Sequence, residues 1–208
     1  MKILAVSDHA PERVYTLASS GQLQDVELIL GCGDLPYTYL EFLVTVLNVP
    51  LFYVPGNHDP QELPNLESRH AEGGFNLDLR LVRHKKFLIG GLGGSIRYKP
   101  EGSNQYSHAE AWMRASRMIP RLIMNRLQYG RALDILISHS PPHGIHDAQD
   151  PAHRCLKAVN FLIRLAQPRY HLHGHTHFYR RNLENPETTI GLTRVINIYP
   201  YRIIEASH

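Results

Sequence analysis

Seven short apolar runs, spaced along the whole chain, constrain the fold more than any other feature of the sequence. They are rich in β-branched and aromatic residues and cover positions 3–6, 26–30, 51–54, 87–89, 135–137, 170–172 and 195–198. Runs of this length and composition are typical of buried strands. Four segments between them have apolar residues at helical spacing: 11–19, 37–47, 109–127 and 156–166, with a break expected at Pro120. This alternation of strands and helices indicates an α/β sheet fold.

The C-terminal part departs from the alternation. Positions 178–206 contain turn signals at Asn185-Pro186 and at Gly191, with strand-like runs on either side. This pattern predicts an antiparallel hairpin. A length of 208 residues fits one domain with a substantial core, so we expect a single domain over residues 1–208.

Composition excludes several classes of protein. Hydrophobic residues make up 43% of the chain and charged residues 20%, as in an ordinary globular protein and unlike a membrane or disordered protein. The formal net charge of +3 is too small to indicate nucleic-acid binding. We therefore expect neither a membrane nor a nucleic acid as a partner, and the sequence leaves the oligomeric state open.

The two cysteines and the N-terminus bear on the compartment. Cys32 and Cys155 are far apart in the sequence and cannot form a disulfide framework, which fits a reducing environment. The first apolar run has only four residues, too few for a signal peptide or a membrane span. We expect a cytoplasmic protein.

Metal-competent side chains directly follow five of the predicted strands. They are Asp8, Asp34, the group Asn57, His58 and Asp59, then His139, and finally His173, His175 and His177. In an open α/β sheet the carboxyl ends of the strands converge on one crevice. One aspartate alone is most often a helix N-cap, and one buried histidine alone is most often a hydrogen-bonded core residue. Five strand ends that all carry such donors predict a metal site.

The order and spacing of these residues resemble a known superfamily. The set Asp8, Gly33-Asp34, Gly56-Asn57-His58-Asp59, His139 and Gly174-His175-Thr176-His177 resembles the D-x-H, G-D, G-N-H-D/E, H and G-H-x-H blocks of the calcineurin-like metallophosphoesterases. The resemblance runs from Ser7 to His177. It implies a four-layer α/β/β/α sandwich with two divalent metal ions above the strand ends. The imidazole ligands favour Mn²⁺, Fe²⁺, Zn²⁺ or Ni²⁺ over Ca²⁺.

The resemblance also implies a role for each residue. One ion would be held by Asp8, Asp34 and His177, and the other by Asp34, Asn57, His139 and His175. A carboxylate such as Asp34 can bridge two ions that lie roughly 3.5–4 Å apart. A hydroxide between the ions would attack a phosphate ester, preferentially a phosphodiester, and His58 would protonate the leaving oxygen or stabilise charge. Asp59 would orient that imidazole or cap a helix.

One position departs from the superfamily pattern. The D-x-H block requires a histidine at position 10, where this chain has Ala10, with His9 displaced by one residue. Adjacent residues that leave a strand point to opposite sides, so His9 is a poor substitute. Some superfamily members that lack site ligands act as protein-binding scaffolds, as in the retromer subunit with this fold. The alternative function is therefore a catalytically weak, metal-poor scaffold, and a nuclease of the same superfamily ranks below a small-molecule phosphoesterase.

The loop after His139 supplies two further candidates. His146 and Asp147 would form a wall of the pocket for a small phosphorylated substrate, because this loop leaves the same crevice as a metal ligand. Hydrogen bonding within the loop, with Asp147 as a helix cap, is an equally supported alternative. Tyr98 and Tyr106 flank another polar loop, and the sequence does not separate a place in the crevice from ordinary packing.

Overall fold

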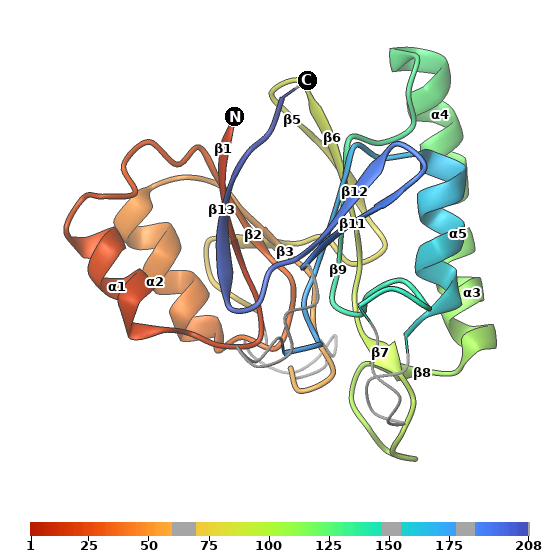
Figure 1. The fold of residues 1–208 in the computed structure, drawn as a ribbon, viewed down its shortest axis with the longest axis horizontal. Helices are drawn as coiled ribbons and strands as arrows, with labels where there is room; N and C mark the ends of the chain where they lie inside the picture. The colour runs from red at the N-terminus through yellow and green to blue at the C-terminus, as the bar shows by residue number, and fades with distance from the viewer. Residues whose placement is uncertain (60–69, 147–154, 178–185, 208) are drawn as a thin grey trace.

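Two β-sheets lie face to face, and helices cover the outer side of each (Figure 1). The computed structural model describes residues 1–59, 70–146, 155–177 and 186–207. The arrangement is a four-layer α/β/β/α sandwich, so the predicted fold class is confirmed. Within the described ranges, no helix is both long and apolar enough to cross a membrane.

The first sheet contains the N-terminal strands. Its order is β13 (Tyr201–Glu205), β1 (Lys2–Val6), β2 (Leu28–Gly31), β3 (Leu51–Tyr53) and β4 (Gly74–Asn76). Strands β1 to β4 run parallel, whereas β13 pairs with β1 in the antiparallel direction. Helices α1 (Glu12–Ser19) and α2 (Tyr37–Leu47) cover the outer face of this sheet.

The second sheet contains most of the C-terminal half. Its order is β11 (Glu187–Ile190), β12 (Thr193–Asn197), β10 (Tyr170–His173), β9 (Ile135–Ser138), β6 (Phe87–Leu92) and β5 (Leu81–His84). The four inner strands run parallel, and each edge strand is antiparallel to its neighbour. Its outer face is covered by α3 (His108–Ser116), α4 (Ile119–Tyr129) and α5 (Lys157–Ala166). A small pair, β7 (Ser95–Ile96) and β8 (Gln105–Tyr106), lies near the base of α3.

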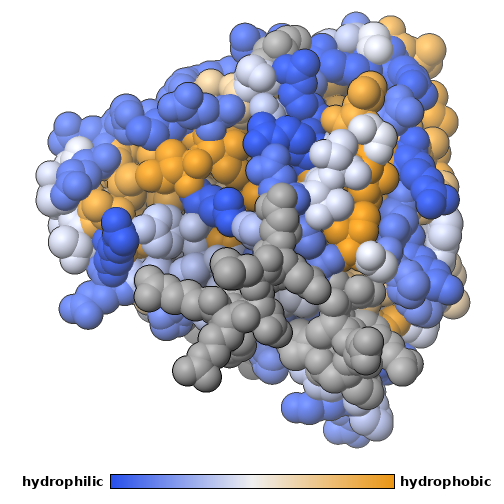
Figure 2. Space-filling view, in the orientation of Figure 1, coloured by the Kyte–Doolittle hydropathy of each residue, from blue (hydrophilic) through white to orange (hydrophobic). Residues whose placement is uncertain are grey.

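Both faces of the inner strands are buried, which explains their continuous apolar runs. In β1, Ile3 and Ala5 pack between the two sheets, whereas Leu4 and Val6 pack under α1 and α2. Figure 2 shows apolar side chains gathered on the left and on the right of the view, with hydrophilic side chains between and around them. The core is therefore divided into one layer between the sheets and one under each group of helices.

The predicted elements are present, with small shifts at their ends. The seven apolar runs form β1, β2, β3, β6, β9, β10 and β12, although β2 begins at Leu28 rather than at position 26. The third predicted helix is divided into α3 and α4, and Pro120 lies in the first turn of α4, where its missing N–H breaks no bond within that helix. The predicted hairpin is formed by β11 and β12, with Gly191 at φ +58° in its turn. Strands β4, β5, β7, β8 and β13 were not predicted.

Candidate metal centre

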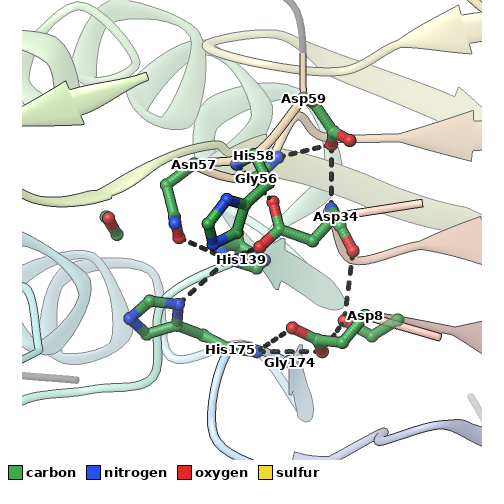
Figure 3. Close-up of polar contacts among 12 residues, drawn as sticks. Asp8, Asp34, Gly56, Asn57, His58, Asp59, His139, Gly174 and His175 are labelled. Atoms are coloured by element: carbon green, nitrogen blue, oxygen red, sulfur yellow. Dashed lines mark hydrogen bonds and ion pairs between the residues drawn. The ribbon is translucent and has the colours of Figure 1, made fainter. Parts of the chain in front are cut away.

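Loops from both sheets converge on one site at the carboxyl ends of the parallel strands (Figure 3). A cavity of about 310 Å³ is lined by Asp8, Asp34, Asn57, His58, Tyr98, His175 and His177. His139 lies beneath it, with a side chain that is fully buried. The structure thus brings together all seven residues to which the sequence assigned metal binding or catalysis.

His139 lies at the centre of the donor atoms. Its Nε2 atom is 3.0 Å from Asn57 Oδ1, 3.1 Å from His175 Nδ1 and 3.3 Å from Asp34 Oδ2. Donor atoms that share one ion at bond lengths near 2.1 Å are themselves separated by about 3.0–3.5 Å. Asp34, His139 and His175 each offer a ligand atom within 4.8 Å of the others. These nitrogen and oxygen donors fit a divalent transition-metal ion.

The buried contact on the other side of the His139 ring fixes its tautomer. Nδ1 is 2.9 Å from the Cys32 carbonyl oxygen, which can only accept a hydrogen bond. Nδ1 therefore carries a proton, and Nε2 faces the donor cluster. A histidine that donates one N–H to a carbonyl and offers its other nitrogen to a metal is the usual arrangement in metal sites.

Asp34 and His139 form a buried ion pair when no metal is bound. Burial lowers the pKa of His139, but the charge of Asp34 and its hydrogen bond outweigh this effect and raise the pKa to about 10. Burial likewise raises the pKa of Asp34, and the contact with His139 outweighs it and holds the pKa at about 2. An incoming ion must therefore displace a proton from His139.

The group of residues expected to hold the first ion has fewer donors. His177 Nε2 lies 3.5 Å from Asp8 Oδ1, and the His177 ring stacks on Tyr199 with the ring centres 4.3 Å apart. Ala10 packs against the apolar cluster under α1 and α2, and His9 is exposed. Neither lines the cavity. No donor at position 9 or 10 replaces the expected histidine.

Three of the proposed ligands have left-handed backbones. The φ angles are +62° at Asp8, +55° at Asp34 and +67° at His175. Asp8 and His175 are each the central residue of a tight three-residue turn, closed by hydrogen bonds of 2.7 Å from His9 N to Ser7 O and of 2.8 Å from Thr176 N to Gly174 O. Such conformations cost roughly 1–3 kcal/mol each and cluster at functional sites.

Asp59 connects two loops rather than orienting His58. Its Oδ2 atom accepts hydrogen bonds from Asp34 N at 2.8 Å and from Gly56 N at 2.7 Å, and its Oδ1 accepts from Leu35 N at 3.2 Å. The His58 backbone N–H donates to Asp34 Oδ1 at 2.7 Å, and its side chain is exposed at the cavity. Asp59 thus fixes the relative position of the loops after β2 and β3, and the suggestion that it orients the imidazole finds no contact to support it.

Comparison with known proteins identifies the family. A family model described as calcineurin-like phosphoesterase matches residues 1–179. The chain belongs to the calcineurin-like phosphoesterase family. This confirms the resemblance drawn from the motif blocks and places the chain in a superfamily of metal-dependent hydrolases.

Solved structures with a similar fold share little sequence with this calcineurin-like phosphoesterase. TT1561 of Thermus thermophilus superposes with a TM-score of 0.60 at 20% identity, covering 95% of this chain and 88% of that chain. GAP50, described as the anchor in the inner membrane complex of Plasmodium, has a TM-score of 0.50 at 11% identity, with 95% and 70% covered. A Vps29 mutant from Entamoeba histolytica has a TM-score of 0.44 at 14% identity, with 95% and 73% covered. A search of curated proteins gives no match.

Of the two residues predicted to form a substrate wall, the structure describes His146 alone. His146 Nδ1 lies 2.9 Å from His173 Nε2, and His146 Nε2 lies 3.0 Å from Thr188 Oγ1. His146 is not among the residues that line the cavity. Asp147 lies outside the described residues. The role of both residues in substrate binding stays a prediction.

Two tyrosines that lie outside the family motifs also contact residues of the site. Asn57 Nδ2 donates a hydrogen bond of 3.1 Å to Tyr98 Oη, and Tyr98 lines the cavity. Tyr199 stacks on His177 from a loop at the far end of the sequence. The family motif blocks include neither position. For Tyr98 the only signal was its polar loop, and for Tyr199 there was none.

Proposed function

We propose that this calcineurin-like phosphoesterase hydrolyses phosphate esters of small molecules, preferentially phosphodiesters, with two divalent metal ions. The observation that carries the proposal is the convergence of Asn57, His175 and Asp34 donor atoms on His139 Nε2. Beside this cluster, the exposed imidazole of His58 lines the same cavity. A set of metal ligands next to a proton donor is what phosphate ester hydrolysis requires.

The donor groups divide between two ions as the resemblance implies. Asp34, Asn57, His139 and His175 would hold one ion, and Asp8, Asp34 and His177 the other. When bound, the ions supply a nucleophilic water at neutral pH and neutralise charge on the phosphoryl oxygens. Asn57 is a neutral ligand, which limits the negative charge that an anionic substrate meets. We propose Mn²⁺, Fe²⁺, Zn²⁺ or Ni²⁺ as the ions.

His58 is held close to the metal ligands through its backbone. Its N–H donates to Asp34 Oδ1 at 2.7 Å, while its exposed side chain is able to reach a bound substrate. An imidazole in this place protonates the leaving oxygen or stabilises negative charge on it. The cavity of about 310 Å³ is at the small end of ligand pockets, which favours a small phosphorylated molecule over a polymer. The two free cysteines, both buried, fit a reducing compartment, and we propose a cytoplasmic location.

A protein-binding scaffold is the second candidate, and the observation that favours it is Ala10. Without a histidine there, the first ion has only Asp8, Asp34 and His177 as ligands. A scaffold has no need of metal. Metal content therefore separates the two functions.

The deciding experiment combines metal analysis with an activity screen. The purified protein is incubated with each of the four ions, desalted and analysed for bound metal. It is then assayed on a phosphomonoester, a phosphodiester and a cyclic nucleotide. We expect about one equivalent or more of bound metal and hydrolysis of the diester. Less than roughly a tenth of an equivalent on folded protein would end the phosphoesterase proposal and leave the scaffold.

Replacement of His58 tests the proton donor separately from the metals. His58→Ala is expected to lower the rate of hydrolysis by roughly 10²–10⁴-fold while bound metal stays unchanged, because His58 is not a ligand. His84→Ala is the matched control, since His84 pairs with Phe87 at the beginning of β6, at the opposite end of the strand from the site. Equal rates for wild type and His58→Ala would remove His58 from the mechanism.

A further inference from the structure

Tyr98 contacts a metal ligand and the cavity at the same time. Its hydroxyl is 3.1 Å from Asn57 Nδ2, and its side chain is half-buried in the wall of the cavity. The hydroxyl has no other hydrogen-bond partner in the part of the chain that the structure describes. Tyr98 lies between β7 and β8, outside every motif block of the family.

The loop that carries Tyr98 is fastened to the loop that carries Asn57. Gln105 Oε1 accepts hydrogen bonds of 3.1 Å from the backbone N–H groups of Tyr98 and Lys99. The buried Asn104 side chain donates from Nδ2 to the carbonyl oxygens of Gly56 at 3.0 Å and Asp59 at 3.1 Å. These contacts hold the tyrosine in a fixed place relative to the candidate metal ligands. A side chain that acts on a ligand requires such fixed placement, whereas a side chain on an ordinary surface loop does not.

The hydrogen-bonding capacity of an amide decides which group donates to which. Asn57 Oδ1, the atom that faces His139 Nε2, would be the atom that offers a lone pair to a metal ion. Nδ2 can then only donate, and the acceptor it faces is Tyr98 Oη. The tyrosine hydroxyl therefore accepts from the amide, and its own proton is left for another acceptor. In the cavity, an oxygen of a bound substrate would be such an acceptor.

We propose that Tyr98 has two tasks: it holds the Asn57 amide with Oδ1 toward the metal, and it donates a hydrogen bond to a phosphoryl oxygen of the substrate. The second task rests on the proposed function, and the first does not. A phosphoryl oxygen gains hydrogen-bond strength as charge develops in the transition state, so this contact acts mainly on kcat.

Tyr98→Phe removes the hydroxyl and keeps the ring. Titration of the metal-free protein with Mn²⁺, followed by electron paramagnetic resonance, is expected to show the tighter site weakened by about 10–100-fold, the usual effect of losing a contact to a metal ligand. At saturating Mn²⁺, kcat for the phosphodiester is expected to fall by about 10-fold or more, with KM changed by less than about threefold. Tyr106→Phe is the control, because Tyr106 follows the same loop but packs under Arg114, with the guanidinium 4.0 Å from its ring centre. Tyr106→Phe should change neither the Mn²⁺ affinity nor kcat.

The outcomes separate the two tasks from each other and from the proposed function. An unchanged Mn²⁺ affinity overturns the positioning of Asn57. A loss of kcat that disappears at saturating Mn²⁺ overturns the contact with substrate. If the wild-type protein hydrolyses none of the three ester types, the proposed function fails, whereas the Mn²⁺ titration of Tyr98→Phe still decides the first task.

Discussion

Glycine residues constrain the site as strictly as its ligands do. A Cβ atom on Gly174 would lie 1.7 Å from Ser7 Oγ and 2.3 Å from Asp8 Oδ2. A Cβ atom on Gly56 would lie 2.0 Å from Asp34 Oδ1. The glycines that precede the Asn57 and His175 blocks thus allow one loop to approach the carboxylate of another without contact from a side chain.

This close approach predicts the effect of a single methyl group. Gly174→Ala is expected to lower the free energy of unfolding by about 1–3 kcal/mol and to weaken metal binding, because the new Cβ must push Ser7 and Asp8 aside. Urea unfolding and a Mn²⁺ titration measure the two effects. Gly130→Ala is the control: it has φ +74° and open space around it, so it costs about 1–2 kcal/mol and leaves metal binding unchanged. Equal metal affinity in both variants would contradict the prediction.

The sequence located the candidate ligands because each follows a strand in a fixed motif. It did not locate Tyr98 or Tyr199, whose places depend on contacts between loops that are far apart in the chain. The role of Asp59 also required the structure, because its carboxylate accepts from backbone N–H groups of a loop 25 residues earlier. A sequence reveals functional residues that stand in a motif of fixed spacing. It does not reveal residues that reach the site only because distant loops contact each other.

At the scale of elements, prediction succeeded where burial is continuous. Strands such as β1 and β9 are buried on both sides, so every residue in them is apolar or small except Lys2, at the half-buried start of β1. The strands that escaped prediction are short and partly exposed: β4 has three residues, and β7 has two. Such strands exist because neighbouring backbone pairs with them, and that pairing leaves no periodic pattern.

The beginning of α3 offers a test at this scale. Ser107 Oγ accepts from Glu110 N at 3.2 Å, and Glu110 Oε2 accepts from Ser107 N at 2.7 Å, a reciprocal cap. Ser107→Ala is expected to lower the free energy of unfolding by about 1 kcal/mol, measured by urea denaturation. Ser116→Ala, which removes only an exposed hydrogen bond to Met113 O, should stay within about 0.5 kcal/mol. A cap variant as stable as this control would show that packing alone fixes the helix.

At the scale of the whole molecule, the site joins the two halves of the sandwich. Asp8, Asp34 and Asn57 follow strands of the first sheet, whereas His139 and His175 follow strands of the second. The donor cluster therefore exists only when the two sheets are packed against each other. We therefore expect metal binding and the stability of the entire fold to be linked through this geometry.

Because of this linkage, we expect the stability of the protein to depend on pH in opposite ways with and without a bound metal ion. In the metal-free protein, His139 has a pKa raised from 6.5 to about 10, so its contribution is complete below pH 6.5 and is lost as the pH rises toward 10. Asp34 has a pKa lowered from 3.8 to about 2, so its contribution is present above pH 3.8 and is lost as the pH falls through 2. The ion pair therefore stabilises the metal-free protein most between pH 3.8, above which the contribution of Asp34 is complete, and pH 6.5, below which that of His139 is complete.

A bound metal ion reverses the trend on the alkaline side, because it replaces the proton on His139 Nε2. Metal affinity should rise by up to about tenfold per pH unit as that proton becomes easier to remove. Thermal unfolding at several pH values between about 6 and 9, with EDTA or with Mn²⁺, measures the effect. We expect the difference between the two melting temperatures to widen as the pH rises. His139→Gln removes that proton together with the imidazole ligand, so the widening above about pH 7 should be lost. A difference that stays constant in the wild type would show that metal binding displaces no proton from the pair.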